Sequence, residues 1–177
     1  MRRALLIAVA LVLAACDQKP AATTPSPHDL TADAIGHYCG MNVLEHPGPK
    51  GQIILASRVD PVWFSSARDT IAFTMLPEEA KDIQAIYVSD MARAESWDKP
   101  GAANWVEARK AWFVLDSRMR GGMGAEEAVP FSSRDAAARF VGDNGGRIAA
   151  FGDIPRDYVL GGTAPEAPSH EQHAPDK

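Results

Sequence analysis

One short segment occurs twice in this chain, and this repeat limits the possible folds more than any other feature of the sequence. The segment 61–69 (PVWFSSARD) resembles the segment 129–135 (VPFSSRD). In each copy a pair of serines follows an apolar stretch and opens a helical pattern. Ser66 and Ser132 each stand three residues before an aspartate, which is the spacing of a capping box. Both copies therefore predict the start of a helix.

The repeat predicts two structural units of the same design. A helix at 67–76 ends at Pro77, and a second helix at 134–141 ends at an Asn-Gly-Gly sequence. Strand-like apolar runs flank both helices, at 52–57, 61–64 and 83–88 in the first half and at 111–115, 128–131 and 147–151 in the second. We predict an α+β fold in which two similar ββαβ units, at about 35–92 and 93–160, pack into one small domain. A coincidence between two common helix starts is the alternative.

Length and composition are consistent with this size. A chain of 177 residues fits one domain or two small ones, and a hydrophobic content of 46% excludes global disorder. The net charge of -5 gives no basic surface for nucleic acid. Two cysteines are too few for a disulfide-stapled fold.

The N-terminus has the layout of a bacterial lipoprotein signal. Two arginines precede the apolar run 4–15, which is shorter than a membrane span. The run ends in Leu-Ala-Ala-Cys, the lipobox pattern. We therefore expect removal of residues 1–15 as a signal peptide and lipidation of Cys16, with palmitate-type acyl chains. An ordinary signal peptide that contains a stray cysteine is the alternative.

Lipidation would also set the location of the protein. Two acyl chains give stable anchoring, so we expect the periplasmic side of a bacterial membrane. Asp17 resembles the inner-membrane retention signal of enteric lipoproteins, which favours the inner membrane, with the outer membrane as the alternative. Residues 16–34, rich in Pro, Ala and Thr, are expected to form a flexible lipidated tether, and residues 161–177 a disordered tail.

The sequence contains no common catalytic motif. P-loop, dinucleotide-binding, Cys-x-x-Cys, His-Glu-x-x-His and Gly-x-Ser-x-Gly patterns are all missing. A thiol-dependent enzyme stays formally open because His37 and His46 lie near Cys39 in the sequence. No oxyanion-hole motif accompanies them, so we expect a binding protein and not an enzyme.

The segment His37-Tyr38-Cys39-Gly40-Met41 carries the most informative chemistry. Thiolate and thioether are soft ligands and favour Cu(I). Residues i and i+2 of an extended chain point to the same side, and Gly40 allows the backbone to turn so that both sulfur atoms approach one ion. A buried cysteine beside a packing methionine is the alternative.

Two further methionines are candidate ligands. Met123 stands between glycines in the sequence GGMG, where it has little to pack against locally, so it can be an exposed ligand or a cap on the core. Met91 follows a strand-like run and is more typical of a core residue than of a ligand.

Several longer segments occur in order behind the lipobox. They are 38–41 (YCGM), 46–52 (HPGPKGQ), 63–69 (WFSSARD), 85–91 (AIYVSDM), 97–100 (WDKP) and 121–124 (GGMG). Together they cover nearly the whole globular region and resemble the NosL family, periplasmic lipoproteins encoded with nitrous oxide reductase. The resemblance implies two ββαβ units and a Cu(I) chaperone. Such a chaperone supplies the copper-sulfur (CuZ) centre of nitrous oxide reductase with the help of an ABC-type maturation complex.

The resemblance also implies which residues bind the metal. The family's Cys-Gly-Met motif falls on Cys39 and Met41, the best-supported copper ligands, and its Gly-Gly-Met-Gly loop falls on Met123 as a third. His37 and His46 stay weaker candidates for an imidazole ligand or a second metal, and Zn(II) can compete through the thiolate and a histidine. A metal-free assembly adaptor is a further alternative.

Overall fold

A computed structural model describes residues 24–161 of the 177-residue chain. The predicted signal peptide, the lipidation at Cys16 and the tail beyond 161 therefore lie outside the described residues. Within 24–161 no helix combines the length and the apolar character that crossing a bilayer requires.

The first unit forms a sheet of four antiparallel strands in the order β2-β1-β3-β4. Its elements are β1 (Gly51–Leu55), β2 (Val62–Phe64), α1 (Ala67–Met75), β3 (Ile83–Ser89) and β4 (Trp105–Glu107). Helix α1 packs so closely on β1 that a Cβ atom at Gly51 would stand 1.8 Å from the Thr70 hydroxyl oxygen. Glycine at this position therefore fixes how near the helix lies to the sheet.

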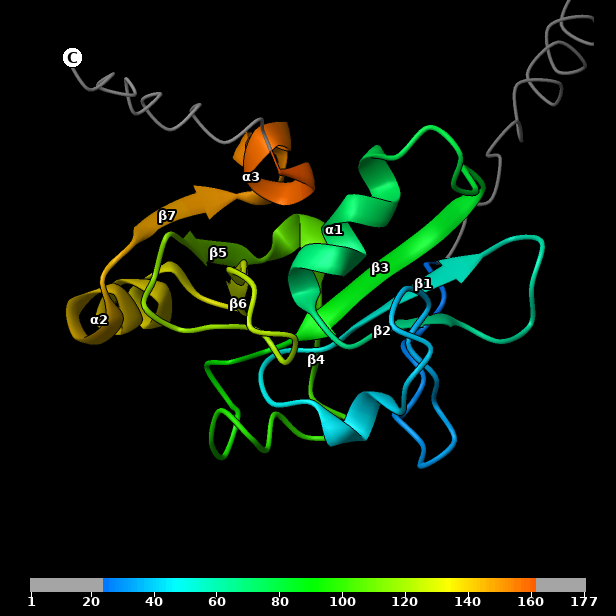
Figure 1. Cartoon of the computed structure of the whole chain (residues 1–177), viewed down its shortest axis with the longest axis horizontal. Coiled ribbons are helices and arrows are strands. Elements are labelled where there is room, and N and C mark those ends of the chain that lie inside the picture. Colours follow the sequence, from blue (N-terminus) through cyan, green and yellow to red (C-terminus); the bar gives the residue numbers. More distant parts are fainter. Residues whose placement is uncertain (1–23, 162–177) are drawn as a thin grey trace, which may run out of the picture.

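The second unit repeats the arrangement in a smaller sheet, in the order β6-β5-β7. Its elements are β5 (Trp112–Leu115), β6 (Val129–Phe131), α2 (Arg134–Asn144) and β7 (Arg147–Ala150). In both units the first strand is central, the second lies on one side, and the strand after the helix lies on the other (Figure 1). The predicted α+β fold of two ββαβ units is therefore confirmed.

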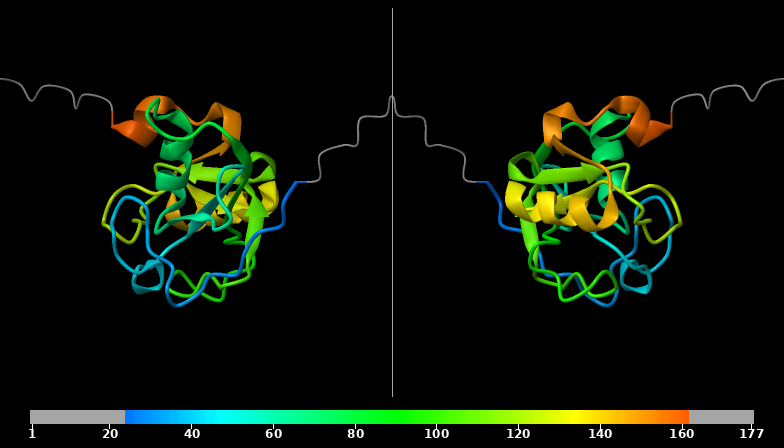
Figure 2. Two further views of the ribbon diagram at one scale, coloured as in Figure 1. Left: turned by 90° about the vertical axis from the view of Figure 1, so that its right-hand side faces the viewer. Right: turned by 90° about the vertical axis from the view of Figure 1, so that its left-hand side faces the viewer.

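The two units share one core. The largest apolar cluster combines Ile53 and Ile71 of the first unit with Phe113 and Leu115 of the second, all of them fully buried. Sequence analysis missed β4 and the short helices η1 (Val43–Glu45), η2 (Ala108–Lys110), η3 (Phe151–Asp153) and α3 (Arg156–Leu160). Figure 2 shows α3 on one side of the sheets and the loops of the N-terminal region on the other.

Both helix starts are capped by serine, but in the second unit the capping serine stands one residue later than predicted. The hydroxyl of Ser66 accepts from the Asp69 amide at 3.1 Å, as predicted. In the second unit the N-cap is Ser133, which accepts from the Ala136 amide at 3.2 Å, and not Ser132. The Ser132 amide instead donates to the carboxylate of Asp90 at 2.9 Å, which holds Ser132 outside the helix.

The ordered domain begins before the predicted boundary at residue 35. The His28 amide donates to the Gln52 side chain, whose own amide donates back to the His28 carbonyl, both at 2.8 Å. The Tyr87 hydroxyl donates to the Pro25 carbonyl at 2.7 Å, and Leu30 is buried. Residues 24–34 are therefore part of the domain, because the buried polar groups of the first sheet find their partners there. Only the part of the predicted tether before residue 24 lies outside the described residues.

Candidate metal centre

The Cys39 residue lies in a tight loop that is fastened to the edge strand β2. The Gly36 amide donates to the Met41 carbonyl and the Gly40 amide to the Gly36 carbonyl, both at 2.9 Å. The His37 amide donates to the Trp63 carbonyl on β2 at 2.8 Å. Gly40 has a φ of +65°, so the turn needs glycine there. The backbone thus forms the turn that the Cys-Gly-Met spacing predicts.

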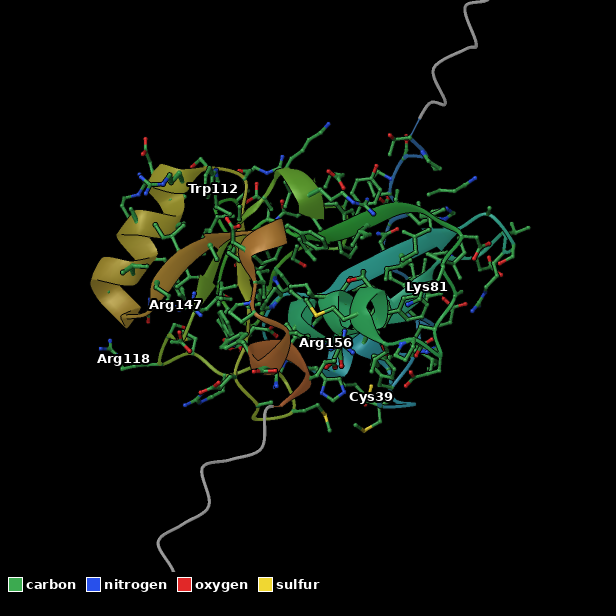
Figure 3. All side chains as sticks on the ribbon, turned by 90° about the horizontal axis from the view of Figure 1, so that it is seen from above. Cys39, Lys81, Trp112, Arg118, Arg147 and Arg156 are labelled. Carbon is green, nitrogen blue, oxygen red and sulfur yellow. The ribbon has the colours of Figure 1, made fainter. Side chains whose placement is uncertain are left out.

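The thiol of Cys39 is half-buried and takes part in no disulfide. Its Sγ atom lies 3.6 Å from the Ser65 hydroxyl, 3.9 Å from the Met41 carbonyl oxygen and 4.0 Å from the Gly36 carbonyl oxygen. Figure 3 shows the residue at the edge of the molecule. One side of the sulfur therefore faces the protein, and the other stays open to an incoming ion.

The thioether side chains predicted as ligands are both exposed. Met41 is 39% exposed and Met123 is 56% exposed. Met123 stands in a turn in which the Gly121 amide donates to the Ala125 carbonyl at 2.9 Å and the Gly124 amide to the Gly121 carbonyl at 2.8 Å. Exposed methionines are unusual in a domain with a well-packed core. Their exposure leaves two soft sulfur donors free to bind a ligand.

The turn of Met123 packs against the chain that follows the Cys39 loop. A Cβ atom at Gly122 would stand 2.5 Å from Cβ of His46 and 3.1 Å from the Pro47 carbonyl oxygen. The tertiary fold thus brings the GGMG sequence of the second unit onto the first unit, next to the segment that continues from Met41. Three more exposed apolar residues belong to the Cys39 loop and its continuation, namely Ile35, Tyr38 and Leu44.

The two histidines differ in their availability. Nε2 of His37 lies 3.1 Å from Oε1 of Glu79, and the ring packs edge-on against Phe64 and Phe73. Nε2 of His46 is buried and has no hydrogen-bond partner within residues 24–161. His37 is thus occupied by Glu79, whereas His46 has a ring nitrogen that is enclosed and, among the described residues, unpaired, and it contacts the Met123 turn.

Met91 occupies a different environment. It packs against the apolar cluster of the second unit together with Trp97 and Trp112, and its amide donates to the Pro130 carbonyl at 3.0 Å. We leave Met91 out of the proposed donor set because its side chain fills this cluster.

Two buried charged residues lie beneath the site, and sequence analysis gives no reason to single out either. Lys50 is 1% exposed, and its ammonium donates to the carbonyls of His46 and Pro47. Burial lowers the pKa of Lys50 to about 8, and the neighbouring Glu127 side chain partly opposes this change. Burial raises the pKa of Glu127 to about 8. In the sequence, each of the two is marked only by its position just before an apolar run.

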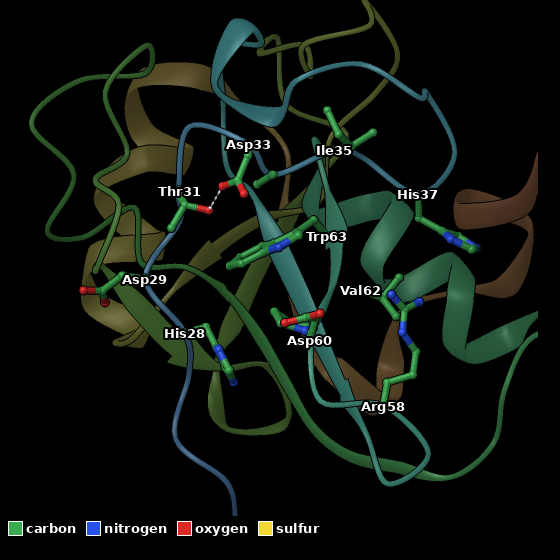
Figure 4. Close-up of a pocket in the computed structure, with 12 residues that line it drawn as sticks. His28, Asp29, Thr31, Asp33, Ile35, His37, Arg58, Asp60, Val62 and Trp63 are labelled. Atoms are coloured by element: carbon green, nitrogen blue, oxygen red, sulfur yellow. Dashed lines mark hydrogen bonds between the residues drawn. The ribbon is translucent and has the colours of Figure 1, made fainter.

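A separate cavity of about 440 Å³ lies between the N-terminal segment and the β1–β2 hairpin. Its polar lining includes Asp29, Asp33, Arg58 and Asp60, arranged around the ring of Trp63 (Figure 4). The cavity offers oxygen and nitrogen donors, and sulfur donors are not among its lining residues. Within residues 24–161 no three His, Cys, Asp or Glu side chains gather closely enough to hold a metal ion. The metal chemistry predicted here therefore depends on the methionine sulfur atoms.

Fold and donors together define a class of protein: a small two-unit α+β domain with a sulfur-rich candidate metal site. The family model named NosL matches residues 27–159. The chain belongs to the NosL family, which confirms the resemblance seen in the sequence.

Known relatives agree with this assignment. The chain is 50% identical over 159 residues to the copper-binding lipoprotein NosL of Achromobacter cycloclastes, covering 89% of this chain and 82% of that protein. It is 31% identical over 140 residues to the copper-binding lipoprotein NosL of Stutzerimonas stutzeri, covering 79% and 72%. The crystal structure of the copper chaperone NosL from Shewanella denitrificans superposes with a TM-score of 0.69 at 32% identity, covering 76% of this chain and 98% of that one.

Proposed function

We propose that this protein binds Cu(I) through the sulfur atoms of Cys39, Met41 and Met123 and passes the ion on without catalytic turnover. The observation that carries the proposal is a half-buried thiol in a loop whose methionine is exposed. A second exposed methionine belongs to a turn that packs against His46 and Pro47, a few residues after the Cys39 loop. Relatives that are named as copper-binding lipoproteins and as a copper chaperone support the choice of metal.

The exposure of the donors suits transfer. An ion held by few ligands at the surface can be taken over stepwise by the ligands of a partner. The exposed apolar side chains of Ile35, Tyr38 and Leu44, which neighbour Cys39 and Met41 in the sequence, offer surface for such a contact. We propose delivery to the CuZ centre of nitrous oxide reductase through an ABC-type copper and sulfur maturation complex.

The proposed location follows from the N-terminus. Lipidation of Cys16 would anchor the protein on the periplasmic side of the membrane, with Asp17 favouring the inner membrane. Anchoring raises the effective concentration of a chaperone at a membrane-bound partner.

The contacts of Cys39 do not favour a thiol-dependent enzyme. Within residues 24–161 the hydrogen-bond partners of its Sγ atom are Ser65 and two backbone carbonyls, and neither histidine is among them. His37 is paired with Glu79 instead. A cysteine nucleophile is normally activated by a base within hydrogen-bond reach.

The test is a metal titration under anaerobic conditions. The wild-type chain should bind Cu(I), and both Cys39→Ser and Met41→Ala should bind it more weakly in competition with a chromophoric Cu(I) chelator. An enzyme that uses only the thiol would tolerate the loss of Met41. A metal-free adaptor would show no Cu(I) binding in any of the three proteins.

A further inference from the structure

Glu127 is a buried carboxyl group whose two oxygen atoms have very different surroundings. The residue is 1% exposed and stands two residues before β6. Its Oε1 atom accepts from the Arg68 amide at 2.8 Å, from the Ala128 amide at 2.9 Å and from the Ser66 hydroxyl at 3.4 Å. Its Oε2 atom has no hydrogen-bond partner within the described residues. Burying a carboxyl oxygen without a hydrogen-bond partner costs free energy, so packing alone does not explain why a glutamate stands at this position.

The Oε1 atom joins the second unit to the first. Glu127 belongs to the second unit, whereas Ser66 and Arg68 form the N-terminal end of α1 in the first unit. The first amides of a helix have no partner inside the helix, and the helix dipole favours a carboxyl group there. Glu127 therefore caps a helix of the opposite unit and fixes its own position relative to that helix.

The Oε2 atom supports the turn that carries Met123. A Cβ atom at Gly121 would stand 2.8 Å from Oε2, so the backbone of the turn rests directly on the carboxyl group. The next residue, Gly122, packs against His46 and Pro47 in the same way. The turn is thus held from two sides by buried or half-buried groups of fixed position.

The same helix start also contacts the thiol. Ser65 directly precedes the N-cap Ser66, and its hydroxyl lies 3.6 Å from Sγ of Cys39. The start of α1 therefore touches Cys39 through Ser65 and Glu127 through Ser66. A short series of contacts runs from the thiol to the turn of Met123.

We propose that Glu127 is a positioning residue of the copper site, which holds the turn of Met123 at a fixed place relative to Cys39 without contacting the ion. This inference rests on the proposed function, because it assumes that both sulfur atoms bind copper. Removing such a support loosens one ligand and leaves the others in place. Residues that orient metal ligands typically change metal affinity by about 10- to 100-fold when they are lost.

The experiment is a double-mutant cycle on Cu(I) affinity. Glu127→Ala and Gly121→Ala are each made in the full chain and in the chain carrying Met123→Ala, and Cu(I) binding is measured by competition with a chromophoric chelator. Glu127→Gln keeps the size and the acceptor atom of the side chain and tests for rescue. Gly142→Ala is the matched control, because a Cβ atom there meets nothing within 4 Å. If Glu127→Ala does not fold, Gly121→Ala tests the same contact from the other side.

We expect Glu127→Ala and Gly121→Ala to weaken Cu(I) binding about 10-fold when Met123 is present. Both should have no effect in the Met123→Ala chain, while Glu127→Gln and Gly142→Ala stay close to wild type. An equal loss in both backgrounds, or no loss in either, overturns the inference. If wild type binds Cu(I) and Met123→Ala binds it equally well, the inference fails and the Cys39–Met41 site stands. If wild type binds no Cu(I), the proposed function itself fails.

Discussion

The sulfur of Cys39 lies directly over Gly36, so that a Cβ atom at Gly36 would stand 2.6 Å from Sγ. The thiol can occupy this position only because residue 36 has no side chain. The thiol is the end of a short side chain that can rotate, whereas the backbone of Gly36 is fixed by its hydrogen bonds to Met41 and Gly40.

We predict that Gly36→Ala displaces the thiol and weakens Cu(I) binding about 10-fold, a loss of ~1.4 kcal/mol. The metal-free protein should keep its melting temperature, because alanine at a compatible backbone position restricts the unfolded chain and offsets the small rearrangement. Thermal unfolding and Cu(I) competition, each compared with Gly152→Ala, check both parts. A Cβ atom at Gly152 meets nothing within 4 Å. Unchanged Cu(I) affinity in Gly36→Ala would show that the position of the thiol does not limit binding.

Met123→Ala should separate binding from stability. The side chain is 56% exposed, so its loss should change the free energy of unfolding by no more than about 0.5 kcal/mol in the metal-free protein. Saturating Cu(I) should raise the melting temperature of wild type more than that of the variant, since ligand bound to the folded state stabilises it. Calorimetry with and without Cu(I) gives both values. A large drop in the metal-free melting temperature would place Met123 in the core.

Met41→Ala should change the preference between metals. A thioether is a soft ligand that binds Cu(I) well and contributes little to Zn(II), which prefers thiolate, imidazole and carboxylate. Cu(I) binding should therefore weaken about 10-fold or more, while Zn(II) binding stays nearly the same. Parallel titrations with the two ions measure the ratio. An equal loss for both would mean that Met41 acts by shaping the loop and not as a donor.

Glu127 should make the stability of the metal-free protein depend on pH. Its pKa is raised by burial from 4.5 to about 8, so between these values the folded protein holds a proton that the unfolded chain releases. The free energy of unfolding due to this group is therefore highest below about pH 4.5 and decreases as the pH rises towards 8. Glu127→Gln lacks this contribution and should gain stability relative to wild type between pH 5 and pH 8.

Denaturant unfolding of both proteins at several pH values measures this difference. Titrating groups far from Glu127 are common to the two chains and cancel in the comparison, whereas Lys50 and Asp69 interact with Glu127 and belong to the measured difference. A constant difference across the range would show that Glu127 is ionised in the folded protein at pH 5.

Much of the fold was readable from local signals. The helix starts at the two serine pairs, the stops at Pro77 and near Gly145, and six of the seven strands follow from capping and apolar patterning, which act over a few residues. The second capping serine was predicted as Ser132, and the structure places the cap on Ser133. Strand β4 was missed because only three residues, Trp105–Glu107, pair with β3, and their partner strand supplies the stabilisation. The ordered N-terminal segment was missed for a similar reason. Its proline-rich composition is typical of a linker, whereas the contacts that hold it in place come from residues far along the chain, such as Gln52, Tyr87 and Ala102.

The sequence by itself determined the repeat of two ββαβ units, the family, and the Cys-Gly-Met turn, because each depends on residues close together in the chain. Tertiary structure alone decided what surrounds that turn. It buried Lys50 and Glu127, paired His37 with Glu79, packed Met91 into an apolar cluster, and set the Met123 turn against His46. These contacts join residues far apart in the chain, and burial and pairing depend on what the folded chain brings together, which no local pattern records.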